Sequence, residues 1–509
     1  MYFSRLLPLT TWLLLLPAVS HALSPPQSDL SDLSAPHPHG SHQGEQLATV
    51  TDLFARAENV IAGLGQSLEE AIRRRDADAF LSLFALPERS MQGLQGWFGQ
   101  ITDIAGTASD LEVSFTLPVV GVQDTRILGI NGLLHVSISA AETTTARDLP
   151  LNVVSLVRTG ENWSIGQPEG GEFPADSSLT VTSASFASRP HPDEQSLTAR
   201  AVFTVCNDGE APLESLPFYL RFALRFTEAT IDGRPARGAM SLGTLGGLPA
   251  ARLDLDLDTP LNPAETREVA FAWTTSFASH QFGRKPLGFE PDRGFILWES
   301  GWYPHAATDF VMTPYRMEIT APPGCLALTS GTLTERRPSA EGDVFTYECS
   351  LPSPPYLVWG RYTVSTAEIG GTGVEIWTPD SGEITPEPMQ ARLADILAFY
   401  GRILPPTTLS GHRVVAVTRF GGYGPPGNLL LEDTHFAPEA LARAENVDLV
   451  AHELAHSWVN SIALPGGDLL LPLSEGIATF LGPRAVEEIL HHRTIGHRQD
   501  PAAPQMEAG

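Results

Sequence analysis

The sequence predicts a multidomain α+β protein, and three observations lead to this prediction. The chain has 509 residues, enough for about three domains of ordinary size. Hydrophobic residues make up 42% of the chain and charged residues only 18%, a balance typical of folded domains with large cores. The hydrophobic periodicity also changes along the chain. It is first helical and then strand-like within residues 46–170, strand-like from 176 to 365, and helical again from 366 onward.

The net charge argues against two classes of partner. The chain carries 59 acidic and 32 basic residues, a formal charge of −27. Nucleic-acid binding requires a basic surface, and anionic membranes also attract basic surfaces. We therefore expect no nucleic-acid partner and no anionic membrane partner. The sequence does not specify an oligomeric state.

The first 22 residues have the features of a cleaved signal peptide. Arg5 precedes an apolar run over residues 6–19, and the small residues Ser20 and Ala22 occupy the positions that a signal peptidase recognises. Cleavage after Ala22 predicts export to the periplasm or the extracellular space, without stable membrane insertion afterwards. An uncleaved N-terminal anchor is the alternative. Residues 23–45 are rich in Ser, Pro and His and predict a flexible linker.

Residues 46–170 predict an α+β domain. Apolar residues recur at helical spacing from Leu53 to Leu68, and strand patterns follow over 111–117, 126–138 and 149–158. Helices followed by an antiparallel sheet resemble the SnoaL-like cone fold, so we expect a cone-like domain. This resemblance implies no active residue, and a spacer or docking role is the expectation.

Residues 176–365 predict an all-β domain of sandwich type. Apolar and polar residues alternate in several segments, such as 198–205 and 267–273, with Pro and Gly between them. Asn207-Asp208-Gly209 predicts a hairpin turn. Cys325 and Cys349 flank what reads as a second hairpin, so a disulfide between them is a hypothesis that export would permit.

The segment His452-Glu453-Leu-Ala-His456 carries the clearest chemical signal. It lies in a predicted helix over 448–459, where a separation of four residues places His452 and His456 on one face, able to bind one metal ion. Glu453 is turned by about 100° from His452 and can stay off the metal. Two imidazoles are too few for tight zinc binding, and Glu475 offers a third ligand after eighteen residues, 457–474. A helix with two structural histidines is the alternative.

This motif resembles that of the gluzincin zinc metallopeptidases of the alanyl aminopeptidase (membrane alanyl aminopeptidase-like) family. Trp458 follows the second histidine, and Trp302-Tyr-Pro304 and residues 315–322 are similar to that family's N-terminal β domain. The resemblance implies one Zn²⁺ ion, held by His452, His456 and Glu475. It also implies a peptide or protein substrate and a thermolysin-like catalytic domain over 366–493, after the β domain of 176–365.

A mechanism follows from the same residues. Zinc lowers the pKa of a bound water, and Glu453 can accept a proton from that water and deliver it to the leaving amine. We therefore expect an exported zinc-dependent metallopeptidase, an aminopeptidase or oligopeptidase with Glu453 as its catalytic residue.

Two differences from the family pattern bear on this expectation. Aminopeptidases of the family carry a Gly-x-Met-Glu-Asn strand whose Glu binds the substrate's α-amine, but residues 420–428 are not acidic, and Glu432 and Asp433 follow later. Endopeptidase activity therefore remains open. The family also uses a tyrosine downstream of the third ligand, but here no tyrosine follows Tyr423.

The resemblance consequently implies a catalytic domain that is truncated after Glu475, with residues 494–509 as a disordered tail. Tyr423, His491 and His492 are candidates to replace the missing hydroxyl. The alternative function is a non-catalytic zinc-binding pseudopeptidase that acts as a binding or regulatory protein.

Overall fold

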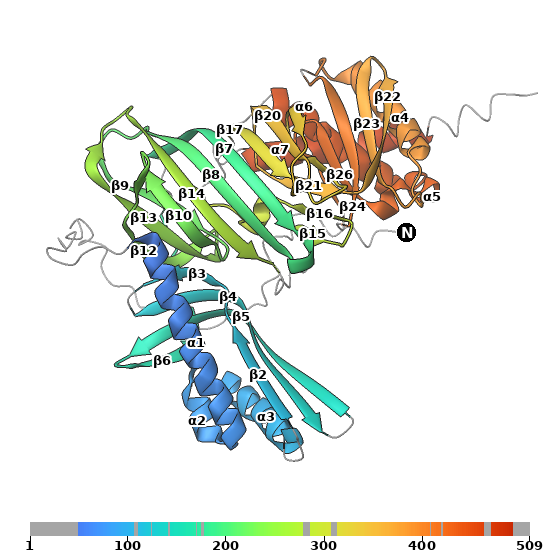
Figure 1. The fold of residues 1–509 in the computed structure, drawn as a ribbon. Helices are drawn as coiled ribbons and strands as arrows, with labels where there is room; N and C mark the ends of the chain where they lie inside the picture. Colours follow the sequence, from blue (N-terminus) through green and yellow to red (C-terminus); the bar gives the residue numbers. More distant parts are fainter. Residues whose placement is uncertain are drawn as a thin grey trace, which may run out of the picture. The chain divides into compact units, whose positions relative to one another are not determined.

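The structure is a computed structural model, and it describes residues 49–491 apart from short gaps. The gaps are 106–109, 124, 141–142, 169, 175–177, 278–285, 307–312, 408, 419–420 and 463–469. The predicted signal peptide (1–22), linker (23–45) and tail (494–509) lie outside the described residues. The described chain is mostly β-structure with a few helices (Figure 1).

The first part consists of helices followed by a six-stranded sheet, in the order that the periodicity predicts. Its elements are α1 (Val50–Arg74), α2 (Ala77–Ser82), β1 (Phe84–Ala85), α3 (Glu88–Ala105), β2 (Asp110–Thr116), β3 (Val119–Val122), β4 (Arg126–Ala140), β5 (Thr143–Thr159) and β6 (Asn162–Gly166). The strand order is β1-β6-β5-β4-β2, with β3 also paired to β4. Thr49 caps α1, because its hydroxyl accepts from the backbone N–H of Asp52 and the Asp52 carboxylate accepts from that of Thr49.

The middle part contains three sheets. Its strands are β7 (Leu179–His191), β8 (Ser196–Asn207), β9 (Leu213–Leu220), β10 (Arg225–Ile231), β11 (Arg234–Pro235), β12 (Gly238–Leu245), β13 (Leu248–Leu261), β14 (Thr266–Ser276), β15 (Leu287–Phe289), β16 (Arg293–Ile296), β17 (Thr313–Thr320), β18 (Leu326–Leu328), β19 (Thr332–Arg337), β20 (Val344–Ser353) and β21 (Leu357–Gly360). They form an eight-stranded sheet β11-β10-β14-β8-β7-β17-β20-β19, a three-stranded sheet β12-β13-β9 and a four-stranded sheet β15-β16-β21-β18. Aromatic side chains such as Phe218, Phe271 and Trp273 are fully buried between them.

In this part the hairpin predicted at Asn207 is wrong, whereas the hairpin predicted between Cys325 and Cys349 forms from β19 and β20, without the segment at Cys325. Cys325 directly precedes β18, which pairs with β21, whereas Cys349 lies in β20, which pairs with β17 and β19. The two thiols therefore belong to different sheets, and both are free. Likewise, the turn after Asn207 connects β8 to β9 in another sheet. The buried Asn207 amide donates to the carbonyl oxygens of Ala211 and Leu261 and so holds this crossing.

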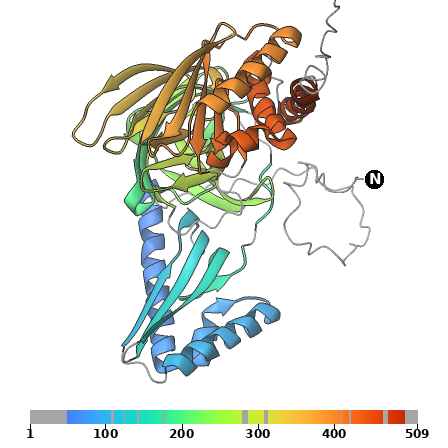
Figure 2. The same ribbon diagram turned by 90° about the vertical axis from the view of Figure 1, so that its right-hand side faces the viewer.

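The last part is a five-stranded sheet with helices on one face (Figure 2). Its elements are β22 (Tyr362–Ile369), β23 (Thr372–Pro379), α4 (Glu387–Ile403), β24 (Gly411–Val417), β25 (Gly422–Tyr423), β26 (Asn428–Glu432), α5 (Pro438–Leu441), α6 (Ala444–Ile462), α7 (Leu470–Val486) and a π-helical turn (Glu487–His491). The strand order is β22-β23-β24-β26-β25, in which β24 is parallel to both β23 and β26. Strand β25 is antiparallel to β26 and lies at the sheet's edge.

Strand β24 is buried on both faces, which explains its continuous apolar sequence. Val414 and Ala416 pack with the helices, whereas the alternating Val415 and Val417 pack with the core of the middle part, β7 to β21, here called the β-rich part. The Tyr400 hydroxyl on α4 donates to the Ala451 carbonyl on α6 at 2.7 Å and ties two of the helices together. Within the described part of the chain, none of the helices has both the length and the apolar character needed to span a bilayer.

Candidate metal centre

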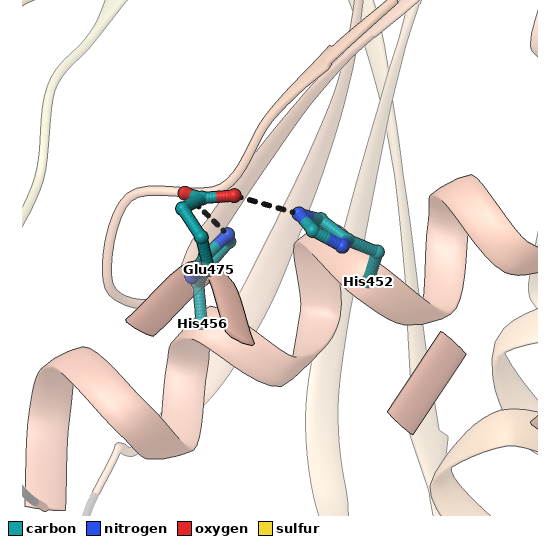
Figure 3. A group of neighbouring side chains, drawn as sticks. All are labelled: His452, His456 and Glu475. Atoms are coloured by element: carbon teal, nitrogen blue, oxygen red, sulfur yellow. Dashed lines mark ion pairs between the residues drawn. The ribbon is translucent and has the colours of Figure 1, made fainter. Parts of the chain in front are cut away.

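Helices α6 and α7 bring three potential metal ligands together. His452 and His456 lie on α6, and Glu475 lies on α7. The opposite side of α6 is buried against the sheet, because Val447, Val450 and Leu454 pack in the core. That burial sets the rotation of α6 about its axis. Both histidines consequently point toward Glu475 (Figure 3).

The spacing of the three side chains fits a single tetrahedral ion. His452 Nε2 lies 3.3 Å from Glu475 Oε2, and His456 Nε2 lies 3.5 Å from Glu475 Oε1. One ligand atom from each residue can be chosen so that all lie within 4.8 Å of one another. Two ligands bound to one zinc ion at about 2.0–2.1 Å are about 3.4 Å apart. Two imidazoles and one carboxylate also form a donor set that Zn²⁺ takes, so these residues fit that ion.

Within the cluster, the carboxylate is more exposed to solvent than the two imidazoles. The side chains of His452 and His456 are 13% and 7% exposed, but that of Glu475 is 46% exposed. A substrate can therefore approach past Glu475, while the histidines are held in the interior.

Burial and hydrogen bonding keep His456 in the form that binds metal. Desolvation lowers the pKa of His456 to about 4, so its imidazole is neutral at neutral pH. Its Nδ1 lies 3.1 Å from the hydroxyl oxygen of buried Ser474, the residue directly before Glu475. When Nδ1–H donates to that oxygen, the Nε2 lone pair faces the cluster.

His452 and Glu475 shift each other's pKa. Burial disfavours the charged form of His452, but the hydrogen bond and charge of Glu475, with the charges of Glu453 and Asp448, raise its pKa overall. Burial also acts to raise the pKa of Glu475, but the hydrogen bond from His452 and the charges of both histidines lower it. The carboxylate therefore remains ionised beside the imidazoles, as a metal ligand requires.

Glu453 is buried beside this cluster but faces a different element. It is 8% exposed, and its carboxylate lies against Gly422 and Gly424, at β25. Among the described residues, the group that can share one ion consists of His452, His456 and Glu475, without Glu453. Glu453 thus lies next to the three grouped ligands without belonging to their group, as the helical spacing predicts.

Among the described residues, the other sequence candidates do not belong to this group of ligands. The Asp433 carboxylate accepts hydrogen bonds from Arg293 at 3.0 and 2.6 Å, and Glu432 lies 4.0 Å from His435. The Tyr423 ring packs edge-on against Tyr356, with ring centroids 5.8 Å apart, at the core of the β-rich part. His491 ends the turn after α7, and His492 lies outside the described residues.

Sequence reasoning missed the roles of Ser474, Gly422 and Gly424. Ser474 carries one signal, its position directly before a predicted ligand. The two glycines carry no comparable signal, because glycine in a Gly/Pro-rich run is typical of any tight loop.

Comparisons with known proteins locate relatives at low identity. None of the family models matches this chain. The M1 zinc metallopeptidase from Deinococcus radiodurans is 19% identical, with a TM-score of 0.47, and the match covers 63% of this chain and 72% of that one. A mutant of that enzyme bound to a Tyr-Ser-Ala substrate is 20% identical, also with a TM-score of 0.47, and covers 63% and 72%.

Curated sequences give the second set of relatives. Leucine aminopeptidase 2 of Aspergillus clavatus is 25% identical over 201 residues, which cover 38% of this chain and 32% of that protein. The Aspergillus oryzae protein of the same name is 26% identical over 187 residues, covering 36% and 30%. The chain thus spans about a third of the length of the curated relatives that it matches. This sequence similarity confirms that the chain resembles the aminopeptidase-like gluzincins, as its His452-Glu453-x-x-His456 motif and Glu475 predict.

Proposed function

We propose that this chain is an exported zinc-dependent metallopeptidase that hydrolyses peptide bonds. One observation carries the proposal: two imidazoles and a carboxylate converge at 3.3 and 3.5 Å, with a separate buried carboxylate beside them. The similarity to leucine aminopeptidases supports it. The signal-peptide features of residues 1–22 support export to the periplasm or the extracellular space.

Each residue has a distinct role in this reaction. His452, His456 and Glu475 would hold the zinc ion, with Ser474 orienting His456. When bound, zinc supplies Lewis-acid chemistry, lowering the pKa of water and polarising a peptide carbonyl. Glu453 accepts a proton from the attacking water and delivers it to the leaving amine. Its burial favours this proton transfer, because competing solvent is kept from the carboxylate.

The remaining parts of the chain have supporting roles in this proposal. The β-rich part over 176–365 packs on the five-stranded sheet of the zinc-binding part. In this proposal the two parts are a β domain and the thermolysin-like catalytic domain that follows it. The cone-like part over 46–170 acts as a spacer or docking domain, since its sequence carries no catalytic motif.

The surroundings of β25 favour an oligopeptidase over a strict aminopeptidase. The side chains of residues 421–428 are not acidic, and the carboxylate of Asp433 is already bound by Arg293. This strand therefore offers no carboxylate to bind a substrate's α-amine. We expect a peptide with an acetylated N-terminus to be cleaved at a rate close to that of the free peptide. Cleavage of the free peptide alone would instead assign aminopeptidase activity.

Metal removal tests the function as a whole. We expect the purified chain to contain one equivalent of zinc by mass spectrometry, and to hydrolyse unstructured peptides. A chelator such as 1,10-phenanthroline should abolish hydrolysis, and added Zn²⁺ should restore it. Zinc-loaded protein that cleaves none of a broad peptide library would reject the peptidase proposal and favour a zinc-binding regulatory protein.

A further inference from the structure

Gly422 in strand β25 and Gly424, directly after that strand, lie against Glu453 and have no room for a side chain. A Cβ added to Gly422 would lie 2.6 Å from both Cγ and Oε1 of Glu453. A Cβ added to Gly424 would lie 2.4 Å from the backbone oxygen of Glu453 and 2.9 Å from Oε2. Separations below about 3 Å are tighter than carbon atoms tolerate, since optimal contact is about 3.5–4.0 Å. Each carboxylate oxygen of Glu453 therefore lies against one glycine.

The strand has little freedom to move away from Glu453. Gly422 pairs with Leu431 and Tyr423 pairs with Leu430 on the fully buried part of β26. Between the two glycines, the Tyr423 ring is held edge-on by the fully buried Tyr356. A side chain at Gly422 would consequently press on the Glu453 side chain, and one at Gly424 would press on its backbone oxygen and Oε2.

We propose that Gly422 and Gly424 are positioning residues for Glu453, and this inference rests on the proposed peptidase function. Gly422 sets where Oε1 lies, and Gly424 sets the path of the backbone together with Oε2. A general base has to lie within hydrogen-bond reach of the proton that it accepts, so a displaced carboxylate loses rate without loss of the metal ligands.

One alanine variant and one control test the positioning. Gly422→Ala should lower kcat by about a hundredfold, the effect expected of an ångström-scale displacement of a catalytic group. Zinc content should stay at one equivalent, and KM should change less than kcat. Gly401→Ala is the control, because Gly401 lies in α4 with open space around its Cβ position. It should retain wild-type kcat. A Gly422→Ala variant with wild-type kcat would overturn the inference.

A double-mutant cycle separates displacement of Glu453 from a general structural defect. Glu453→Gln keeps the size of the side chain but removes the base, so a displacement of this side chain costs nothing further in proton transfer. We therefore expect Gly422→Ala to cost little further kcat in the Glu453→Gln background. An equal hundredfold loss in both backgrounds would contradict the inference.

Thermal unfolding of the zinc-free protein gives a readout that does not depend on activity. Gly422→Ala should lower Tm more in the wild-type background than in a Glu453→Ala background, because it meets the side chain. Gly424→Ala should still lower Tm in the Glu453→Ala background, because its clash with the backbone oxygen of residue 453 remains there. Equal effects of Gly422→Ala in both backgrounds would reject the contact. A wild-type chain without peptidase activity would reject the proposed function instead, so the two failures are distinguishable.

Discussion

At the scale of single residues, Glu453 differs from the three grouped ligands because its carboxylate lies against Gly422 and Gly424 and is not part of that group. We therefore expect Glu453→Gln to keep its zinc, since the three ligands are unchanged, and to lose about 10²- to 10⁴-fold in kcat, the usual contribution of proton transfer. Metal analysis and peptide hydrolysis measure the two effects. Glu445→Gln, on an exposed position of the same helix, is the control. Wild-type activity in Glu453→Gln would remove the assigned role.

Ser474 acts on the cluster through His456. Its hydroxyl oxygen lies 3.1 Å from Nδ1, and removal of such an outer hydrogen bond typically weakens metal binding by about 10- to 100-fold. We expect Ser474→Ala to raise the zinc Kd by that factor in competition with a chromophoric chelator. Thr479→Ala, on the exposed side of α7, should leave the Kd unchanged. Equal Kd values for the serine variant and the wild type would show that the hydrogen bond does not orient the ligand.

At the scale of an element, α7 has one buried and one exposed apolar side. Leu481 is 5% exposed, whereas the adjacent Phe480 is 62% exposed. Leu481→Ala should lower the free energy of unfolding by about 2–5 kcal/mol, because it leaves a cavity in the core. Phe480→Ser should change it by less than about 1 kcal/mol, because the exposed ring loses only its contact with the Arg484 guanidinium, which lies 5.6 Å from the ring centroid. Denaturant titration of both variants checks this, and a larger effect at Phe480 would place the core on the other side of α7.

The β-elements show where pattern reading fails. Alternation predicts that a segment is a strand, but it does not specify which strand becomes its neighbour. Cys325 and Cys349 are symmetric about a polar turn in the sequence, yet the short β18 pairs with β21 and leaves β20 to β17 and β19. The chain between them crosses from one sheet to another, which local sequence does not encode.

At the scale of the whole molecule, one face of the five-stranded sheet β22-β23-β24-β26-β25 packs against the β-rich middle part. Arg293 on β16 donates two hydrogen bonds to Asp433, which follows β26, and both side chains are largely buried. The pair therefore joins the four-stranded sheet, which contains β16, to the five-stranded sheet, which contains β26 and β25. The core residues of β24 also join the two parts, because alternating side chains pack against the helices on one face and against the β-rich middle part on the other.

Loss of this pair should destabilise the molecule as a unit. Asp433→Asn should lower the free energy of unfolding by about 2 kcal/mol, the usual range for hydrogen bonds to charged groups. Asp258→Asn is the matched control, since its contact with Arg234 is 3.8 Å long and both side chains are highly exposed; its effect should stay below about 0.5 kcal/mol. Chemical denaturation measures both. A similar cost for the two variants would mean that the buried pair does not couple the sheets.

The sequence by itself determined the helix that carries His452 and His456, their common face, Glu475 as the third candidate and the separation of Glu453 from them. All of these follow from the 3.6-residue period of one helix and the distance to the next, which are local properties of the chain. Only the tertiary structure decided that Ser474 meets His456, that Gly422 and Gly424 lie under Glu453, and that Arg293 binds Asp433. These contacts join segments distant in sequence or on separate helices, and their geometry depends on how whole sheets and helices pack against one another.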